Sequence, residues 1–137
     1  LIVTDQTPYC TPEIATNLKN PEDVLNHTLL AAEPYMDPWP EWMRIAGVSD
    51  FSSANMIVMP DSNVRIKAAV DGLGIALGNQ FTNVEAQSSE LVRPFDISVR
   101  GPGFYYTIHS SRPQLAERFV DWLKRQAAMT SETDPAS

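Results

Sequence analysis

Residues 62–79, SNVRIKAAVDGLGIALGN, contain three closely spaced glycines, the residue type that lets a nucleotide-binding loop approach phosphate groups. Such a loop needs its glycines after a strand and before a helix, so that helix-terminal N–H groups face the phosphates. Here a helical pattern, capped by Asp61 or Ser62, precedes the glycines, and an apolar strand-like stretch follows them. We therefore interpret the glycines as structural: Gly72 ends the helix in a left-handed conformation, and Gly74 allows close packing of helix against strand.

Serine and histidine side chains could in principle form a hydrolase triad with an aspartate, but the sequence has no G-x-S-x-G nucleophile motif. His27 and His109 fall on separate expected strands and have no neighbouring ligand at helical spacing, so we expect no metal site. We interpret the candidate serines as strand ends and caps; they are Ser52, Ser53, Ser62 and Ser110.

Cys10 is the only cysteine of the chain, which excludes an internal disulfide and a multi-cysteine metal site. We interpret it as a packing residue, because nothing in the sequence marks its thiol as reactive. No phosphate loop, metal set or reactive thiol is therefore indicated, and we expect no cofactor.

Aromatic residues form two groups that could stack on a ligand. Trp39 and Trp42 are three residues apart on an expected helix, and we interpret them as packing residues. Phe104 and Tyr106 would share one face of an expected strand, whereas Tyr105 would face the other way. One of these tyrosines could therefore reach a cleft.

Length, charge and composition limit what these residues can serve. The chain has 137 residues, enough for one sizeable core or for two small lobes that share one. Its net charge of -7 does not favour a nucleic-acid surface, which needs a clustered basic face. No apolar run approaches the roughly 18 residues of a membrane span. Direct binding to DNA or to a membrane is therefore not expected.

Strand and helix patterns alternate along the chain, which predicts an α/β fold with a mixed sheet and flanking helices. Thr11 with Pro12, and Asn20 with Pro21, mark two helix starts, and Gly47 marks a helix end. The expected strands are 1–9, 27–32, 51–60, 74–79, 91–95 and 104–111. The expected helices begin near residues 12, 21, 39, 63, 80 and 113.

The last helix has the clearest amphipathic pattern, and its charged residues lie on its other faces. Its apolar face combines Leu115, Phe119, Trp122 and Leu123.

Six segments in a fixed order resemble the C-terminal part of a LysR-type transcriptional regulator, over about residues 8–126. The resemblance is to the branch that includes the glycine-cleavage activator and the β-lactamase activator. The segments are NPEDVLNHTLLAAE, WPEWMRIAG, RIKAAVDGLGIALGN, LVRPF, FYYTIHSS and RFVDWLKRQ.

The resemblance implies an effector-binding domain of the type 2 periplasmic-binding-protein-like fold, with a cleft between two α/β lobes. Residues 1–95 would form lobe two, residues 96–127 would return to lobe one as a strand and helix, and residues 128–137 would be a flexible tail. The DNA-binding domain and the first half of lobe one would be absent. Leu115, Phe119 and Trp122 would then lack their cover.

The resemblance also implies an effector site. Ser62 and Asn63 match a position that binds effector in the related β-lactamase activator, and helix N-terminal N–H groups suit an anion. Ser62 could act as both cap and contact. Tyr105 matches a tyrosine that reaches the cleft, and Tyr106 replaces it if the register slips by one. The loop after the strand 27–32 adds Ala32 and Glu33.

The function that we expect is effector sensing by a bacterial regulator in the cytoplasm, by binding rather than catalysis. A small molecule would shift the lobes of a homo-oligomer, a dimer or tetramer. The resemblance implies head-to-tail pairing of lobe one against lobe two, to which the outward faces of helix 63–71 and strand 51–59 would contribute. DNA would be reached only through the missing N-terminal domain. Alternatives are a transporter's solute-binding protein of the same fold and a small hydrolase. A carboxylate, a peptide-like molecule and an aromatic remain open as the effector.

Overall fold

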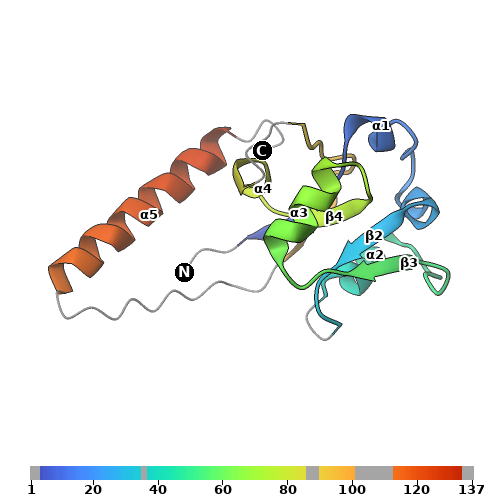
Figure 1. The fold of residues 1–137 in the computed structure, drawn as a ribbon, viewed down its shortest axis with the longest axis horizontal. Helices are drawn as coiled ribbons and strands as arrows, with labels where there is room; N and C mark the ends of the chain where they lie inside the picture. The colour runs from blue at the N-terminus through green and yellow to red at the C-terminus, as the bar shows by residue number, and fades with distance from the viewer. Residues whose placement is uncertain (1–3, 35–36, 86–89, 101–112, 134–137) are drawn as a thin grey trace.

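The computed structural model describes residues 4–34, 37–85, 90–100 and 113–133 (Figure 1). Five strands form one mixed sheet in the order β3-β2-β4-β1-β5, which confirms the expected α/β class. The strands are β1 (Asp5–Tyr9), β2 (Thr28–Ala31), β3 (Asn55–Val58), β4 (Ile75–Gly78) and β5 (Val99–Arg100). The helices are α1 (Pro12–Ala15), the 3-10 helix η1 (Pro21–Asn26), α2 (Trp39–Ala46), α3 (Ser62–Val70), α4 (Thr82–Glu85) and α5 (Pro113–Thr133).

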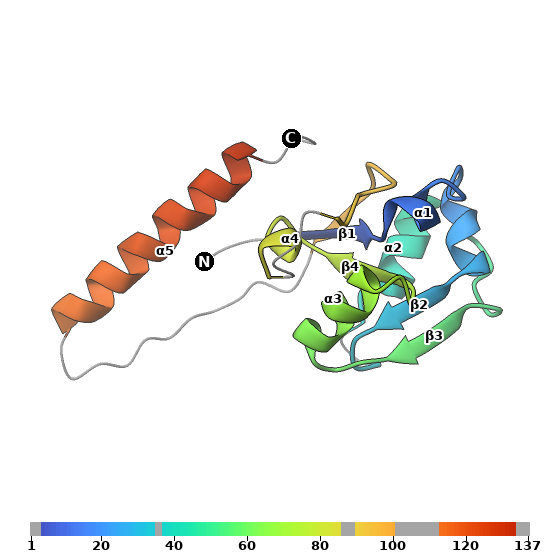
Figure 2. The ribbon, with the colours of Figure 1, turned by 45° about the horizontal axis from the view of Figure 1, so that its top comes forward.

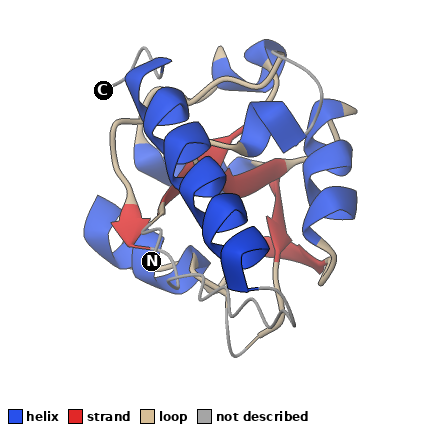
Figure 3. Ribbon diagram, turned by 90° about the vertical axis from the view of Figure 1, so that its left-hand side faces the viewer, coloured by secondary structure: helices blue, strands red, loops and turns tan. Residues whose placement is uncertain are grey.

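Two crossover connections place helices on both faces of the sheet. Strand β2 is parallel to both of its neighbours, β3 and β4, while β1 is antiparallel to β4. The chain moves outward from β2 through α2 to β3, and then back past β2 through α3 to β4. Because crossovers are right-handed, opposite directions of travel put α2 and α3 on opposite faces. Figure 3 shows helices on both sides of the strands.

Alternate residues of the central strands divide between two core clusters, as expected for strands covered on both faces. Leu29 and Ala31 pack on the α2 side, whereas Leu30 packs on the α3 side. Strand β4 repeats the alternation, since Ile75 is in the first cluster and Ala76 in the second.

Both tryptophans of α2 are fully buried, which confirms that they are packing residues. Their rings meet edge to face, with centroids 5.6 Å apart. The indole N–H of Trp39 donates to the Leu30 carbonyl at 3.1 Å, and that of Trp42 donates to the Ile97 carbonyl at 2.9 Å. The N–H group of each buried indole therefore has a hydrogen-bond acceptor.

Local start and stop signals act largely as predicted. Thr11 caps α1, although the helix at Pro21 is a 3-10 helix, and Gly47 ends α2 with φ of 81°. Helix α3 is capped by Asp61, whose carboxylate accepts the N–H groups of its first turn. The expectation that Ser62 could be the cap was wrong, because Ser62 is the first residue of the helix.

Gly72 and Gly74 have different roles. Gly72 follows α3 with φ of 78°, which confirms the left-handed helix end. A Cβ on Gly74 would lie 2.4 Å from the Thr28 carbonyl oxygen and 3.2 Å from Cγ of Leu30. The predicted close approach is therefore present, but its partner is strand β2 and not a helix.

The segment after α4 departs from the prediction. Residues 91–95 form only an isolated bridge, between Val92 and Cys10, instead of a strand. Pro94 cannot donate a ladder hydrogen bond, which limits pairing there. The short strand β5, which pairs with β1 at Val99, was not predicted.

Helix α5 lies apart from the sheet and the other helices in two views (Figures 1 and 2). Phe119 and Trp122 stack on each other with centroids 5.9 Å apart, and each is 48% exposed. These two residues are therefore uncovered, as expected. The helix continues to Thr133, so the first residues of the expected tail are helical. The side chain of Leu115 and the aromatic stretch 104–111 lie outside the description.

Candidate functional site

Three strand ends and the start of α3 meet at one edge of the sheet. Strands β2 and β3 run parallel in register, from Thr28 opposite Asn55 to Ala31 opposite Val58, so their carboxyl ends lie together (Figure 2). The antiparallel strand β1 begins at the same edge, since Thr7 is opposite Gly78 at the end of β4. The connections on either side of β2 run in opposite directions, which makes this edge a topological switch point, where α/β sheets bind ligands.

A cavity of about 380 Å³ opens at this edge, within the range of small-molecule sites. Three of the predicted site residues line it: Ala32, Glu33 and Ser62. Asn63 is exposed and does not line the cavity. Tyr105 and Tyr106 lie outside the described residues. The structure therefore brings together the loop after β2 and the start of α3, which are distant in sequence.

Arg65 and Asp37 also line this cavity, and sequence reasoning missed both. Arg65 lies one turn after Ser62 on α3, and that i, i+3 spacing could have indicated a shared face. Asp37 precedes α2, where its Oδ1 accepts the Trp39 N–H at 3.2 Å. It was overlooked because the sequence DPWP was interpreted only as the entry to a helix.

The two charged groups have shifted pKa values with the same main cause. Burial raises the pKa of Asp37, against the opposing effects of the Trp39 N–H, the charge of Arg65 and the Ala32 N–H. Burial lowers the pKa of Arg65, against the attraction of Asp37 and Asp61. Each charge is thus partly desolvated and feels the other across the cavity.

The N-terminus of α3 has fewer free N–H donors for an anion than we expected. The Asp61 carboxylate accepts the N–H of Asn63 at 2.8 Å and that of Val64 at 3.3 Å. These donors are therefore already used, and the carboxylate itself repels an anion. The Arg65 guanidinium is the positive group that remains on this side of the cavity.

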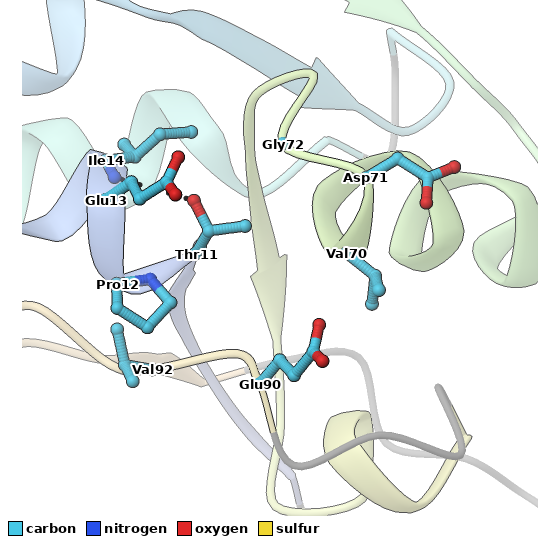
Figure 4. A pocket seen from close by; sticks show the side chains of 9 residues that line it. All are labelled: Thr11, Pro12, Glu13, Ile14, Val70, Asp71, Gly72, Glu90 and Val92. Atoms are coloured by element: carbon cyan, nitrogen blue, oxygen red, sulfur yellow. Dashed lines mark hydrogen bonds between the residues drawn. The ribbon is translucent and has the colours of Figure 1, made fainter.

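A second cavity, of about 510 Å³, lies between α1 and the C-terminal end of α3 (Figure 4). Carboxylates from three segments line it, those of Glu13, Asp71 and Glu90. Asp71 already accepts a 2.7 Å hydrogen bond from Lys67, and none of the predicted site residues line this cavity. It is therefore separate from the edge described above.

Two of the nucleophilic side chains considered in the sequence have surroundings that the structure describes. Cys10 is fully buried, and burial raises its pKa to about 11, so the thiol stays protonated at neutral pH. The Ser52 hydroxyl donates to Asp50 at 2.7 Å. No group of three or more His, Cys, Asp or Glu side chains that could hold a metal occurs in the described part of the chain. Among the described helices, none is long and apolar enough to cross a membrane.

Comparison with known proteins adds independent evidence. The family model of the LysR substrate binding domain matches residues 7–128. The HTH-type transcriptional activator AmpR of Enterobacter cloacae is 36% identical over 122 residues, which cover 85% of this chain and 41% of that protein. The glycine cleavage system transcriptional activator of Escherichia coli K12 is 32% identical over 132 residues, or 91% of this chain and 43% of that protein.

A solved structure agrees with these relatives. The effector domain of the transcriptional regulator AmpR of Pseudomonas aeruginosa superposes with a TM-score of 0.74 at 31% identity, covering 96% of this chain and 65% of that chain. The chain spans less than half the length of the two curated relatives above. It belongs to the LysR substrate-binding-domain family, and it has the type 2 periplasmic-binding-protein-like fold of LysR effector-binding domains.

Proposed function

We propose that this chain senses a small-molecule effector for a bacterial LysR-type transcriptional regulator, in the cytoplasm and by binding rather than by catalysis. The observation that carries the proposal is the cavity at the strand ends, lined by Ala32, Glu33 and Ser62. The sensing signal would pass to a DNA-binding domain outside these residues. The relatives above are transcriptional activators, so they lend no support to a transporter's solute-binding protein.

The proposed mechanism uses two lobes. Residues 1–95 form lobe two, and residues 96–127 return to lobe one. The exposed pair Phe119 and Trp122 supports this division, because exposed aromatic faces commonly mark a contact with another segment. An effector that binds one lobe arrangement more tightly than the other shifts the population toward it.

An apolar surface on β3 and α3 supports the proposal that subunits pair there. Strand β3 is an edge strand of the described sheet, and edge strands offer unpaired backbone groups to another chain. Met56, Ile57 and Val58 are 37–50% exposed, and Val64 of α3 is 54% exposed. We propose that this surface contributes to a homo-oligomer.

The effector proposal can be tested by thermal melting of the chain against a library of metabolites. For a compound that stabilises the chain, Ser62→Ala and Tyr105→Phe should each weaken the stabilisation and leave the unliganded Tm within a few degrees. Ser53→Ala is a matched control, since Ser53 is an exposed serine outside the cavity. Normal stabilisation of both site variants would contradict the site assignment.

The subunit surface has its own test. Sedimentation of the whole regulator should show a smaller assembly for Ile57→Asp. The control Ile45→Asp alters a side chain of α2 that is 46% exposed, against 45% for Ile57. Equal effects of the two variants would argue against a specific role for β3.

A further inference from the structure

The effector cavity contains two opposite charges that attract each other but are not in direct contact. Asp37 and Arg65 both line it, yet no salt bridge joins these two described side chains. Each is half-buried and comes from a different element, Asp37 from the entry to α2 and Arg65 from α3. A ligand that brings both charges can complete this arrangement.

We propose that the effector is a zwitterion, with its carboxylate on Arg65 and its ammonium group on Asp37. An amino acid or a short peptide with free ends has this chemistry. The inference rests on the proposed function, because it names the ligand class of the same cavity.

Arg65 is suited to bind a carboxylate. Its Nη1 donates to the carbonyl oxygens of Met59 and Pro60, which hold the guanidinium at the end of β3. Nε and Nη2 have no hydrogen-bond partner among the described residues. Guanidinium donors on adjacent nitrogens match the two oxygens of a carboxylate. The Ser62 hydroxyl, which lines the same cavity one turn earlier on α3, can add a further donor.

Asp37 is suited to bind an ammonium group. The Asp37 carboxylate accepts the Trp39 N–H at Oδ1 and also a hydrogen bond from the Ala32 N–H. Its two oxygens have about four lone-pair sites, so it can still accept a hydrogen bond from an ammonium group. Glu33 adds a second carboxylate to the lining of the same cavity. Trp39 is fully buried in the core, so the segment that carries Asp37 is anchored.

Partial burial of both charges makes the preference specific. A purely anionic ligand would compensate Arg65 but would further desolvate Asp37 and repel it. A purely cationic ligand would compensate Asp37 but would further desolvate Arg65 and repel it. Because a desolvated charge without a partner is costly, both are disfavoured against a zwitterion. The volume of about 380 Å³ lies near the lower end of ligand cavities, which fits an amino acid or a dipeptide.

Three matched dipeptides can test this proposal. Glycyl-L-leucine carries both charges, N-acetyl-glycyl-L-leucine only the carboxylate, and glycyl-L-leucinamide only the ammonium group. Leucine supplies an apolar side chain that is the same in all three compounds, and the cavity lining includes the apolar residues Leu30 and Leu77. NMR titration of the ¹⁵N-labelled chain should show the amides of Ala32, Glu33 and Ser62 shifting. Glycyl-L-leucine should bind roughly tenfold or more tightly than either derivative, as expected for one lost charge-assisted hydrogen bond.

Variants then assign each charge. Arg65→Gln should weaken glycyl-L-leucine and the N-acetyl derivative but not the amide, whereas Asp37→Asn should weaken glycyl-L-leucine and the amide but not the N-acetyl derivative. Arg65→Lys keeps the positive charge and serves if Arg65→Gln disturbs the fold. Arg44→Gln is the control, because Arg44 is an exposed arginine of α2 paired with Glu41.

The outcomes separate this inference from the proposed function. Equal binding of glycyl-L-leucine and a singly charged derivative, or no shift with any of the three at high millimolar concentration, overturns the zwitterion. A neutral or purely anionic metabolite that shifts the cavity amides also overturns it, and leaves the proposed function standing. Stabilising metabolites that shift only amides outside the cavity would instead contradict the proposed site.

Discussion

Helices α2 and α5 carry similar aromatic pairs, at spacings of three residues, yet the two pairs have opposite environments. Trp39 and Trp42 of α2 are fully buried, whereas Phe119 and Trp122 of α5 are each 48% exposed. The rings of the first pair meet edge to face within the core, and those of the second stack on each other. An amphipathic pattern thus indicates that a face needs cover, but it does not identify the covering segment.

The largest expected effect is at the covered pair. Trp42→Ala removes a fully buried ring and its hydrogen bond to Ile97, and should lower the free energy of unfolding by about 3–5 kcal/mol. Urea denaturation followed by circular dichroism measures this loss. A loss below about 1 kcal/mol would mean that the α2 face is no better covered than that of α5.

Two glycines of the well-packed region differ in what an added Cβ would meet. Gly74→Ala places a Cβ 2.4 Å from a backbone oxygen of β2, and should cost about 1–3 kcal/mol as the strands separate. Gly47→Ala meets no atom within 4 Å but must keep φ of 81°, which costs about 1 kcal/mol. Denaturation midpoints should therefore rank Gly74→Ala below Gly47→Ala. The reverse order would show that backbone strain outweighs the clash.

Asp37, which precedes α2, is also half-buried, and the pH dependence of stability can test the effect of this burial. Because burial raises the pKa of Asp37 above 3.8, its ionisation weakens folding as pH rises through the folded pKa. Asp37→Asn, which does not ionise, should therefore raise Tm at neutral pH, and the gain should vanish at lower pH. Asp50→Asn should have the opposite sign, because hydrogen bonds from Ser52 lower the pKa of Asp50.

The smallest effect is expected on α5. Trp122→Ala removes a side chain that is 48% exposed, and should change the free energy of unfolding by no more than about 0.5 kcal/mol. The same denaturation assay applies, with Trp42→Ala as the reference. A loss comparable to that of Trp42→Ala would show that this face is covered in solution.

Local signals allowed most of the fold to be predicted. Thr11, Gly47 and Gly72 act through their own backbone and near neighbours, so their roles follow from residue type and position. Strand β5 and the bridge of Val92 to Cys10 depend on partners distant in sequence, and they were missed or misplaced.

The candidate site was less accessible to sequence reasoning. Ser62 and Glu33 came from a family resemblance and from strand-end geometry, and they line one cavity. Asp37 and Arg65 were missed because their importance depends on folding, which brings these two opposite charges to the same cavity. No spacing along the chain encodes that distance.

The hydrogen bonds of Arg65 to Met59 and Pro60 have a consequence for cooperativity. They attach a cavity side chain to the two carbonyls that follow the edge strand β3. A ligand that changes the position of Arg65 would therefore also change the end of β3. Thermodynamic linkage makes such a coupling reciprocal, so a partner that immobilises this strand would alter ligand affinity by the same factor that the ligand alters association.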